Sequence, residues 1–551
     1  MTAPQKQLPT DLHIDEIRRL LDEAKTRPLT DAECEQLLSV AMSYSQVGEM
    51  LADRKATIAK LRQMLFGTSS EKSDVVLGKP GTGPSATAAN DEEAADDGAA
   101  KKPAPKGHGR NGADAYHAST RTKVPHESKK AGDKCPEAEC KGILYKQAEP
   151  AVMVRVFGGP PLHAHVCELE RLRCNLCGVV LTAKQPAGLG TDKYDATAAS
   201  MIGLLRYGTG VPFHRLAQLE TDLGVPLPIS TQWDITAGAA KKIGPVFEEL
   251  IRQAAQGELI HNDDTTMQVL DLQAELRASA AEDDASDKRT GIFTTGIVAM
   301  VADRRIALFF TGRKHAGENL ADVLKRRAAD RPPPMQMCDG LLHNLPKELD
   351  VILGNCLVHG RRKFVDVFDN FPEQCRHVLE AFREVYRHDA ITKAQGMSPK
   401  ERLVHHQTHS GPVMDELKLW LDAQLVERKA EPNGRLGKAI IYLQKRWQPL
   451  TLFLRRPGAP LDNNVCEQAL KQAIIHRKNS LFYKTENGAR VGDTFMSLIH
   501  TAKLCGANPF DYLTELQRNA AAVAKDPAAW LPWNYRSAVS GGGVAAAIAA
   551  G

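Results

Sequence analysis

The sequence predicts a multidomain α/β protein, and three observations support this prediction. The chain has 551 residues, which is enough for several domains of ordinary size. Its composition, with 42% hydrophobic and 25% charged residues, is typical of a globular protein. Apolar runs with the character of strands begin near residue 258, and segments with helical periodicity lie before and after them. Together these features predict a mixed sheet flanked by helices.

Composition and charge exclude some classes of protein. No apolar run approaches the roughly 18 residues that cross a bilayer, and the N-terminus lacks the apolar core of a secretion signal. The 11 cysteines are an odd number with uneven spacing, so reduced thiols or metal ligands fit better than disulfides. We therefore expect a cytoplasmic protein without a membrane partner. The net charge of +4 is too small to indicate nucleic-acid binding by the whole chain, so only local basic clusters can support it.

The N-terminal part should contain a helical region, residues 1–72, and a flexible linker, residues 73–132. In the helical region Leu51, Ile58 and Leu65 are spaced seven residues apart, which is typical either of a short coiled coil or of core packing. Residues 78–115 contain no Val, Ile, Leu, Met or aromatic residue, so they cannot bury a core. The basic stretch KKPAPKGHGRN in this linker either contacts DNA phosphates or is a solvated tether.

Residues 133–182 hold two cysteine pairs. Cys135 and Cys140 are separated by four residues, and Cys174 and Cys177 by two. Two such pairs on tight turns can close a tetrahedral thiolate shell around a structural Zn²⁺ ion, as in a zinc ribbon. The alternative is four unrelated cysteines. Because the loop between the pairs is long, three other residues are alternative ligands: Cys167, His163 and His165.

Residues 190–256 show helical periodicity with Gly and Pro at turns. The stretch 212–243 predicts a helix, a turn at Gly224 and a second helix capped by Ser230 or Thr231. This is the outline of a helix-turn-helix that reads DNA. Helical hairpins of this kind also serve as plain packing units.

Residues 257–500 contain the predicted α/β core. In chain order the segments read as three strands, a helix and a short strand: ELIHNDDTTMQVL, GIFTTGIVAMVA, RIALFFTG, GENLADVLKRRAA and PMQMCDG. Helical patterning returns at about residues 360–455. Residues 501–551 should form a C-terminal helical region and a disordered tail.

Three acidic residues of this core lie at positions that ordinary strands disfavour. Asp263 and Asp264 lie within a strand, and Asp339 ends another. Because neighbouring strand residues face opposite sides, only one of Asp263 and Asp264 can enter a common site. Carboxylate oxygens are the ligands that Mg²⁺ prefers. Two such ions about 4 Å apart can activate an attacking oxygen and stabilise a leaving one.

The stretch LDNNVCEQALKQAIIHRKNSLF, residues 461–482, could supply a third carboxylate, Glu467. Asn464, three residues before Glu467, fits a capping box, which explains where this helix begins. Capping does not explain the basic residues that follow in later turns: Lys471, His476, Arg477 and Lys478. Such cations would hold DNA phosphates beside a metal site.

The motifs of this chain resemble those of the insertion sequence 66 family of transposases, in the same order. They are LFGTSSEK, the cysteine module, HNDDT, CDG, CLVHGRRKF, the block at 461–482 and LIHTAKLCGANPFDYL. The resemblance runs from about residue 40 to about residue 520, and the block at 461–482 is highly specific. It implies a DDE transposase with a ribonuclease-H-like mixed sheet and an all-α insertion at about residues 360–455.

The resemblance also implies the site residues. Asp263, Asp339 and Glu467 would be the catalytic acids and the ligands of two Mg²⁺ ions, with Mn²⁺ as a substitute; Asp264 is the alternative first acid. Cys356 and His359 match a Cys-x-x-His signature of similar transposases, or they are a core cysteine and a capping histidine. The family often has Glu at position 264, Tyr after Asp-Gly and Pro at position 465, and none of these departures removes a metal ligand.

These features predict a transposase that cuts and joins DNA by two-metal phosphoryl transfer. The expected partners are double-stranded DNA (the element's terminal inverted repeats and the target), a second copy of the chain and small accessory proteins. The alternatives are an inactive DNA-binding derivative and a nuclease that does not join. The protein should associate with the nucleoid when bound to DNA. Six basic residues are expected to bind phosphates: Arg361, Arg362, Lys363, Lys471, Arg477 and Lys478.

Overall fold

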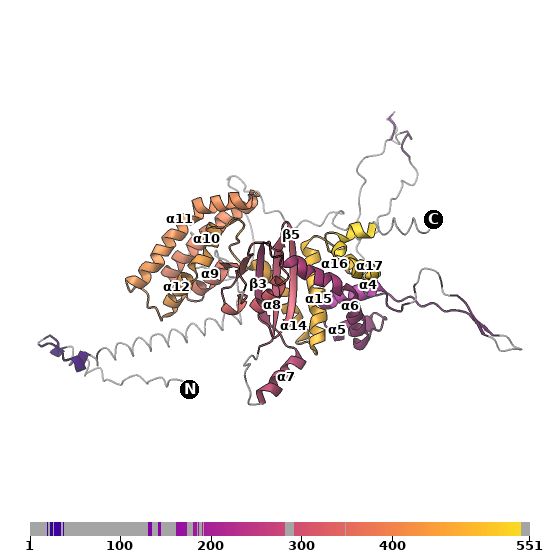
Figure 1. Ribbon diagram of the computed structural model, residues 1–551, viewed down its shortest axis with the longest axis horizontal. Coiled ribbons are helices and arrows are strands. Elements are labelled where there is room, and N and C mark those ends of the chain that lie inside the picture. The colour runs from indigo at the N-terminus through magenta and orange to yellow at the C-terminus, as the bar shows by residue number, and fades with distance from the viewer. Residues whose placement is uncertain are drawn as a thin grey trace, which may run out of the picture. The chain divides into compact units, whose positions relative to one another are not determined.

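The computed structural model describes residues 192–281, 291–347 and 349–540, together with shorter stretches before residue 192. The chain divides into two units, Met1–Thr82 with Ala164–Gly551, and Gly83–His163. In the second unit the described residues include an isolated antiparallel bridge between Lys134 and Ile143. The first unit contains a five-stranded mixed sheet and many helices (Figure 1). The prediction of a mixed α/β protein is therefore confirmed.

The main sheet has the strand order β5-β4-β3-β6-β7. Its strands are β3 (Leu259–Thr266), β4 (Phe293–Val301), β5 (Arg304–Gly312), β6 (Met335–Cys338) and β7 (Ile352–Asn355). Strands β3, β4 and β5 are antiparallel neighbours, whereas β6 and β7 run parallel to β3. The first four strands lie where the sequence predicts them. Strand β7 is not among the predicted strands, because it is short and ends in Gly-Asn, a pair that strands disfavour.

Helices lie before, within and after the strands. Those before the sheet are α4 (Ala196–Gly203), α5 (Phe213–Asp222) and α6 (Ile229–Ala254), and those between strands are α7 (Leu270–Ala281) and α8 (Ala316–Leu324). After β7 come α9 (Leu357–Val365), α10 (Pro372–Ala394), α11 (Pro399–Val426), α12 (Arg435–Lys445), α13 (Trp447–Leu450), α14 (Asn464–Ser480), α15 (Glu486–Leu504), α16 (Pro509–Arg518) and α17 (Ala520–Lys525). A separate pair of short strands, β1 (Arg171–Arg173) and β2 (Val180–Thr182), is antiparallel.

Helix α15 closes the open edge of the sheet at β5. Its side chains Asp493, Ser497 and Thr501 are four residues apart, so they lie on one face of the helix. They accept the backbone N–H groups of every second strand residue from Ala307 to Thr311, at 2.7–3.0 Å. Burial raises the pKa of Asp493 to about 7 despite these hydrogen bonds. The edge strand therefore has no free row of donors with which to pair another chain.

Helix α14 packs directly on the middle of the sheet, and this contact requires a glycine. A Cβ at Gly296 of β4 would lie 2.9 Å from Cγ and Cδ2 of Leu470. The thiol of Cys466 donates to the Gly296 carbonyl at 3.2 Å. Because Cys466 precedes Glu467, the close approach at Gly296 sets the height of the predicted catalytic residue above the sheet.

Helices α9–α12 build a hydrophobic cluster of their own, with Phe364, Phe382, Leu421 and Ile440 fully or almost fully buried. Helix α11 begins with a capping box in which Ser398 and Glu401 satisfy each other's backbone N–H groups. These helices separate the last strand, β7, from α14 in the chain, at about the residues where helical patterning is expected.

The predicted helical hairpin is present as α5 and α6, joined through Gly224 at φ +80°. The prediction of a Ser230 or Thr231 cap is wrong, because α6 begins at Ile229 without a side-chain cap. The hairpin is closed instead by Gln232, whose amide donates to two backbone carbonyls at 3.0 Å. One face of α6 is buried in the main core, and its exposed residues lie in the first turns and farther along the helix, including Lys241 and Lys242.

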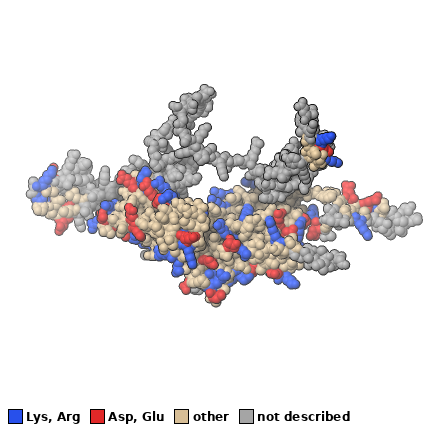
Figure 2. All heavy atoms as spheres, turned by 90° about the horizontal axis from the view of Figure 1, so that it is seen from above, with Lys and Arg blue, Asp and Glu red and all other residues tan. Residues whose placement is uncertain are grey.

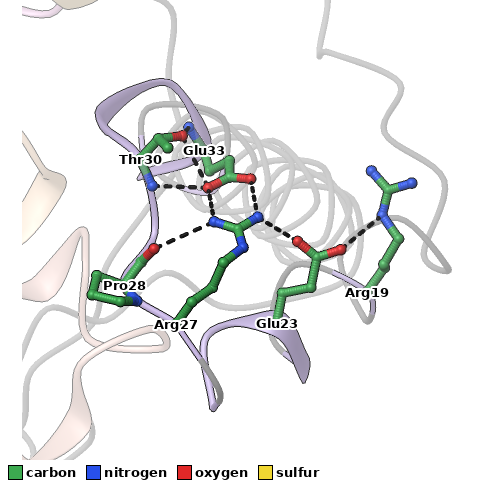
Figure 3. A network of polar contacts seen from close by, with 6 residues as sticks. All are labelled: Arg19, Glu23, Arg27, Pro28, Thr30 and Glu33. Carbon is green, nitrogen blue, oxygen red and sulfur yellow. Dashed lines mark hydrogen bonds and ion pairs between the residues drawn. The ribbon is translucent and has the colours of Figure 1, made fainter.

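Of the predicted N-terminal helices, the structure describes single residues and short stretches between residues 19 and 37. Arg27 forms a bidentate ion pair with Glu33, at 2.7 and 3.0 Å, and also contacts Glu23 (Figure 3). Thr30 and Glu33 form a capping box at the start of a helical turn. The expected coiled-coil stripe and the linker residues 78–115 lie outside the described residues.

The described surface carries charges of both signs. On the face in Figure 2, Lys and Arg side chains are interspersed with Asp and Glu. Among the helices of the described residues, none is long and apolar enough to span a membrane.

Substitution of Gly296 by Ala should destabilise the fold by about 1–3 kcal/mol, because the new Cβ pushes against Leu470 and moves α14 away from the sheet. Urea unfolding of the full chain measures this difference. Gly312→Ala is the matched control, since a Cβ at Gly312 of β5 would meet no atom within 4 Å. Equal stability losses in the two variants would contradict the packing argument.

Candidate active site

The structure brings Asp263, Asp339 and Glu467 to one end of the sheet. In the parallel pair of β3 and β6, His261 lies opposite Met337, so Asp263 is level with Asp339, the residue that follows β6. Glu467 lies in the first turn of α14, which packs on β3 and β4. The pKa of Asp263 is raised to about 7, first by burial and then by the negative charges of Asp339 and Glu467. The three carboxylates are thus close enough to repel one another.

This group of carboxylates fits a divalent cation. One carboxylate oxygen of Glu467 is buried without a hydrogen-bond partner, and the pKa of Asp263 is raised mainly by burial and further by the charges of Asp339 and Glu467. A bound cation would relieve both, and carboxylate oxygens are the ligands that Mg²⁺ prefers. These acids are therefore candidates for binding a divalent cation.

The side chain of the neighbouring Asp264 faces the other side of the sheet and makes different contacts. In the β3–β4 register, Asp263 pairs with Gly296, which faces α14, whereas Asp264 pairs with Thr295. The Asp264 carboxylate accepts the Thr295 hydroxyl at 2.6 Å and the N–H of Ala316 in the first turn of α8 at 2.8 Å. Asp264 therefore fastens α8 to the sheet, and Asp263 is the acid on the side of Glu467.

Asp339 is held by a chain of buried amides. Its Oδ1 accepts the N–H of Leu341 at 2.9 Å and the amide of Asn344 at 2.6 Å. The Asn344 carbonyl in turn accepts the amides of Asn262 and Gln336, at 2.8 and 2.6 Å. These hydrogen bonds connect β3 and β6 to the loop after Asp339, and they fix the orientation of the Asp339 carboxylate.

The helical insertion also contacts this loop. The hydroxyl of Tyr442, in α12, donates to the Asp339 carbonyl at 3.0 Å. The guanidinium of Arg446 lies 4.2 Å from the centre of the Tyr442 ring and donates to the Gly340 carbonyl. Gly340 has φ +81°, and a Cβ there would lie 2.9 Å from Arg446, so the loop requires glycine.

Asn463 fastens the start of α14 to strand β3. Its Oδ1 accepts a hydrogen bond from Nδ1 of His261 at 3.1 Å, and its amide donates one to the Asn262 carbonyl at 3.2 Å. Burial lowers the pKa of His261 to about 4, so this imidazole is neutral. The expected capping box is wrong, because Asn463 rather than Asn464 is the N-cap residue and no side chain caps the helix. Glu467 is one position too far for that motif, and its side chain remains available to the site.

Cys356 and His359 both contact the start of α14. The N–H of Asn463 donates to the buried sulfur of Cys356 at 3.3 Å. His359, one turn further along α9, places Nδ1 3.9 Å from Oε1 of Glu467. Cys356, His359 and Glu467 offer ligand atoms within 4.8 Å of one another, and so do Asp264, His315 and His343.

The predicted basic residues fall into two groups. Lys363, Lys471 and Lys478 are exposed, and Arg362 is half-buried. Arg361 is buried, and Arg477 donates to Thr265 and Thr266 at the end of β3, so both have structural contacts.

His476 does not provide the expected positive charge. It is buried between the rings of Tyr207 and Tyr483, and burial lowers its pKa to about 3.

The predicted zinc ligands Cys135, Cys140, Cys174 and Cys177 lie outside the described residues. The alternative ligands Cys167, His163 and His165 are described, and all three are exposed.

Sequence reasoning misses the residues that hold the three acids in place. Gln336 gives one signal, because it is a polar residue inside the otherwise apolar strand Met335–Cys338. Asn463 has the character of a capping residue, and the loop position of Asn344 gives no signal.

Replacing Asn463 by Ala should lower the free energy of unfolding by about 1–3 kcal/mol, because His261 and the Asn262 carbonyl lose their buried partner. Denaturant unfolding tests this. Asn464→Ala is the control, because the adjacent Asn464 side chain is exposed. The anchoring role is refuted if the two variants are equally stable.

Comparison with known proteins agrees with this arrangement. A family model described as "Transposase IS66 family" matches residues 193–491, which is more than half of the chain. The chain is 26% identical over 526 residues to the uncharacterized protein y4jD of Sinorhizobium fredii (strain NBRC 101917 / NGR234), an alignment that covers 89% of this chain and 96% of that protein. It is 24% identical over 409 residues to the uncharacterized protein y4hP of the same organism, 67% of each chain. The expected family is confirmed: the chain belongs to the IS66 family of transposases.

Proposed function

We propose that this transposase cuts and joins DNA by phosphoryl transfer at Asp263, Asp339 and Glu467, with two Mg²⁺ ions, and that it acts on the terminal inverted repeats of an insertion sequence. The convergence of these three acids, from two strands and a helix, carries the proposal. Mn²⁺ would substitute for Mg²⁺, since both accept carboxylate ligands.

The topology of the sheet supports a ribonuclease-H-like core. Three antiparallel strands, β3–β5, are followed by two strands parallel to the first, with β3 in the middle. The first acid lies in that middle strand, the second directly after the adjacent β6, and the third on a helix packed over the same strands. In this reading α9–α13 are an insertion between the last strand and the helix of Glu467.

The residues of the site have separable tasks in this reaction. The ions, when bound, would supply activation of the attacking oxygen and stabilisation of the leaving oxygen. Leu341 and Asn344 bind one oxygen of Asp339, which leaves the other for an ion. Asn463 holds α14 so that Glu467 stays on the face of β3 that carries Asp263. Water would first cleave the strand at the element's end, and the 3′-hydroxyl released would then attack a target phosphate.

Exposed lysines lie near the site on two helices, α14 and α9. Lys471 and Lys478 share a helix face with Glu467, at spacings of 4 and 11 residues. Lys363 shares a face with His359 on α9, four residues away. With Arg362, these residues would bind DNA phosphates, which fixes the position of the duplex without reading its sequence.

The remaining parts of the chain have proposed tasks of recognition and assembly. Cys135, Cys140, Cys174 and Cys177 would bind structural Zn²⁺ in a module that, with α5 and the start of α6, recognises the inverted repeats. Two ends must be joined in one reaction, so the active form would be a dimer or larger, with small accessory proteins of the element as further partners.

Asp263→Asn, Asp339→Asn and Glu467→Gln should each lower cleavage and joining by about 100-fold to 1,000-fold or more, because each removes a charged ligand that stabilises the transition state. DNA binding should persist. The assay follows nicked and joined products of a labelled duplex carrying the element's end, with Mg²⁺ added. The control is Glu486→Gln, a first-turn glutamate of the neighbouring helix α15.

Each other outcome has a distinct meaning. Cleavage without joined products in the wild type would indicate a nuclease. Binding without cleavage would indicate an inactive derivative or the need for an accessory protein. Full activity in Glu467→Gln would refute the assignment of the third acid.

The triple change of Lys363, Lys471 and Lys478 to Ala should weaken DNA binding about equally for specific and unrelated duplexes, since lysines that bind phosphates read no sequence. The slope of log affinity against log salt should fall by about 0.9 for each phosphate that the variant no longer neutralises. Mobility shifts at several salt concentrations measure both effects. Lys525→Ala, an exposed lysine of α17, is the control. An unchanged slope would exclude these lysines from the DNA interface.

A further inference from the structure

We propose that Nδ1 of His359 is an additional ligand of the ion held by Glu467, which makes this a mixed nitrogen–oxygen site with a stronger preference for Mn²⁺ over Mg²⁺ than carboxylates alone would give. The inference rests on the proposed function, because it concerns the same ion.

The first observation is a pair of buried polar atoms that face each other without partners. Nδ1 of His359 and Oε1 of Glu467 are both buried, and neither has a hydrogen-bond partner. They are 3.9 Å apart, which is too far for a hydrogen bond. Metal–nitrogen and metal–oxygen bonds of about 2.0–2.2 Å each would let one ion bind both atoms across this gap. Buried unpaired polar groups are rare and costly, so a shared ion accounts for two of them together.

The second observation is that the fold holds the histidine in this position. Cys356 is the N-cap residue of α9, and its sulfur accepts the N–H of Asn463, the N-cap residue of α14. The two helices therefore begin at a shared contact. His359 lies in the first turn of α9 and Glu467 in the first turn of α14, and the two side chains face each other. Cys356 acts as the anchor, because its sulfur already accepts this N–H.

The third observation concerns the chemical form of the imidazole. Nδ1 of His359 has no hydrogen-bond partner, so a neutral ring can offer the lone pair of this nitrogen to an ion. A neutral imidazole is a good ligand for transition metals and a poor one for Mg²⁺, whereas carboxylates accept both Mg²⁺ and Mn²⁺. Adding one nitrogen to the carboxylates therefore shifts the preference toward Mn²⁺.

The test is Mn²⁺ binding to the full chain, without DNA, followed by electron paramagnetic resonance. The intensity of the signal from free Mn²⁺, followed through a titration, gives the dissociation constant. Electron spin echo modulation detects a directly bound ¹⁴N. We expect ¹⁴N modulation in the wild type and its loss in His359→Gln, with Mn²⁺ affinity about tenfold weaker and Mg²⁺ affinity nearly unchanged. Labelling the wild type with ¹⁵N-histidine should abolish the ¹⁴N pattern, so the result does not depend on the variant alone.

Two further variants assign the signal. His315→Gln alters the other histidine-containing group, Asp264, His315 and His343, and should leave the modulation unchanged. Mn²⁺ bound in the wild type and lost in Glu467→Gln, but without ¹⁴N modulation, would overturn the role of His359 and leave the proposed function standing. Modulation lost in His315→Gln would also overturn it. Mn²⁺ binding that is unaffected by both Glu467→Gln and Asp263→Asn would refute the ion site itself.

Discussion

The described structure around the site depends on holding three negative charges together that come from distant parts of the chain. Burial raises the pKa of Asp263 most, and the negative charges of Asp339 and Glu467 raise it further, so the three acids repel one another. The surrounding contacts oppose it with neutral groups: the amides of Asn344 and Asn463, the hydroxyl of Tyr442 and the backbone itself. The neutral donors on the Asp339 carboxylate, the Leu341 N–H and the Asn344 amide, fix its direction without neutralising it, which leaves the charge available to a cation.

The same requirement explains why the insertion is attached where it is. A stretch of more than 100 residues separates β7 from Glu467, so the chain alone cannot position α14. Contacts at both ends of the insertion position α14. Cys356, directly after β7, binds the backbone of Asn463, and Tyr442 reaches the Asp339 carbonyl from α12. The insertion is thereby joined to two of the three acids, so a movement of its helices would be transmitted to the site.

The sequence predicts the class of fold and the strands that carry the acids, because alternating apolar residues and strand-ending acids are local signals. β3, β4, β5 and β6 and helix α8 are found in this way. The short strand β7 is missed because its Gly-Asn ending contradicts strand propensity. The role of Asn463 is missed because local rules describe it as a cap, whereas its partners His261 and Asn262 are about 200 residues away. The burial of Arg361 and the contacts of Arg477 with Thr265 and Thr266 are not visible in a run of basic letters.

Fold and ion binding are coupled by this arrangement. A ligand that binds the native chain and not the unfolded chain stabilises the native chain, and three clustered carboxylates form a site that only the folded chain has. A cation bound as proposed would cancel part of the repulsion at Asp263, so the same charges that destabilise the folded chain would become its source of affinity for the cation. The buried, unpaired oxygen of Glu467 agrees with the proposal, because a hydrogen-bond partner within the protein would occupy the position that a cation would take. The neutral amides and the glycine at position 296 hold the acids together without an ion, as the proposed cation site would require.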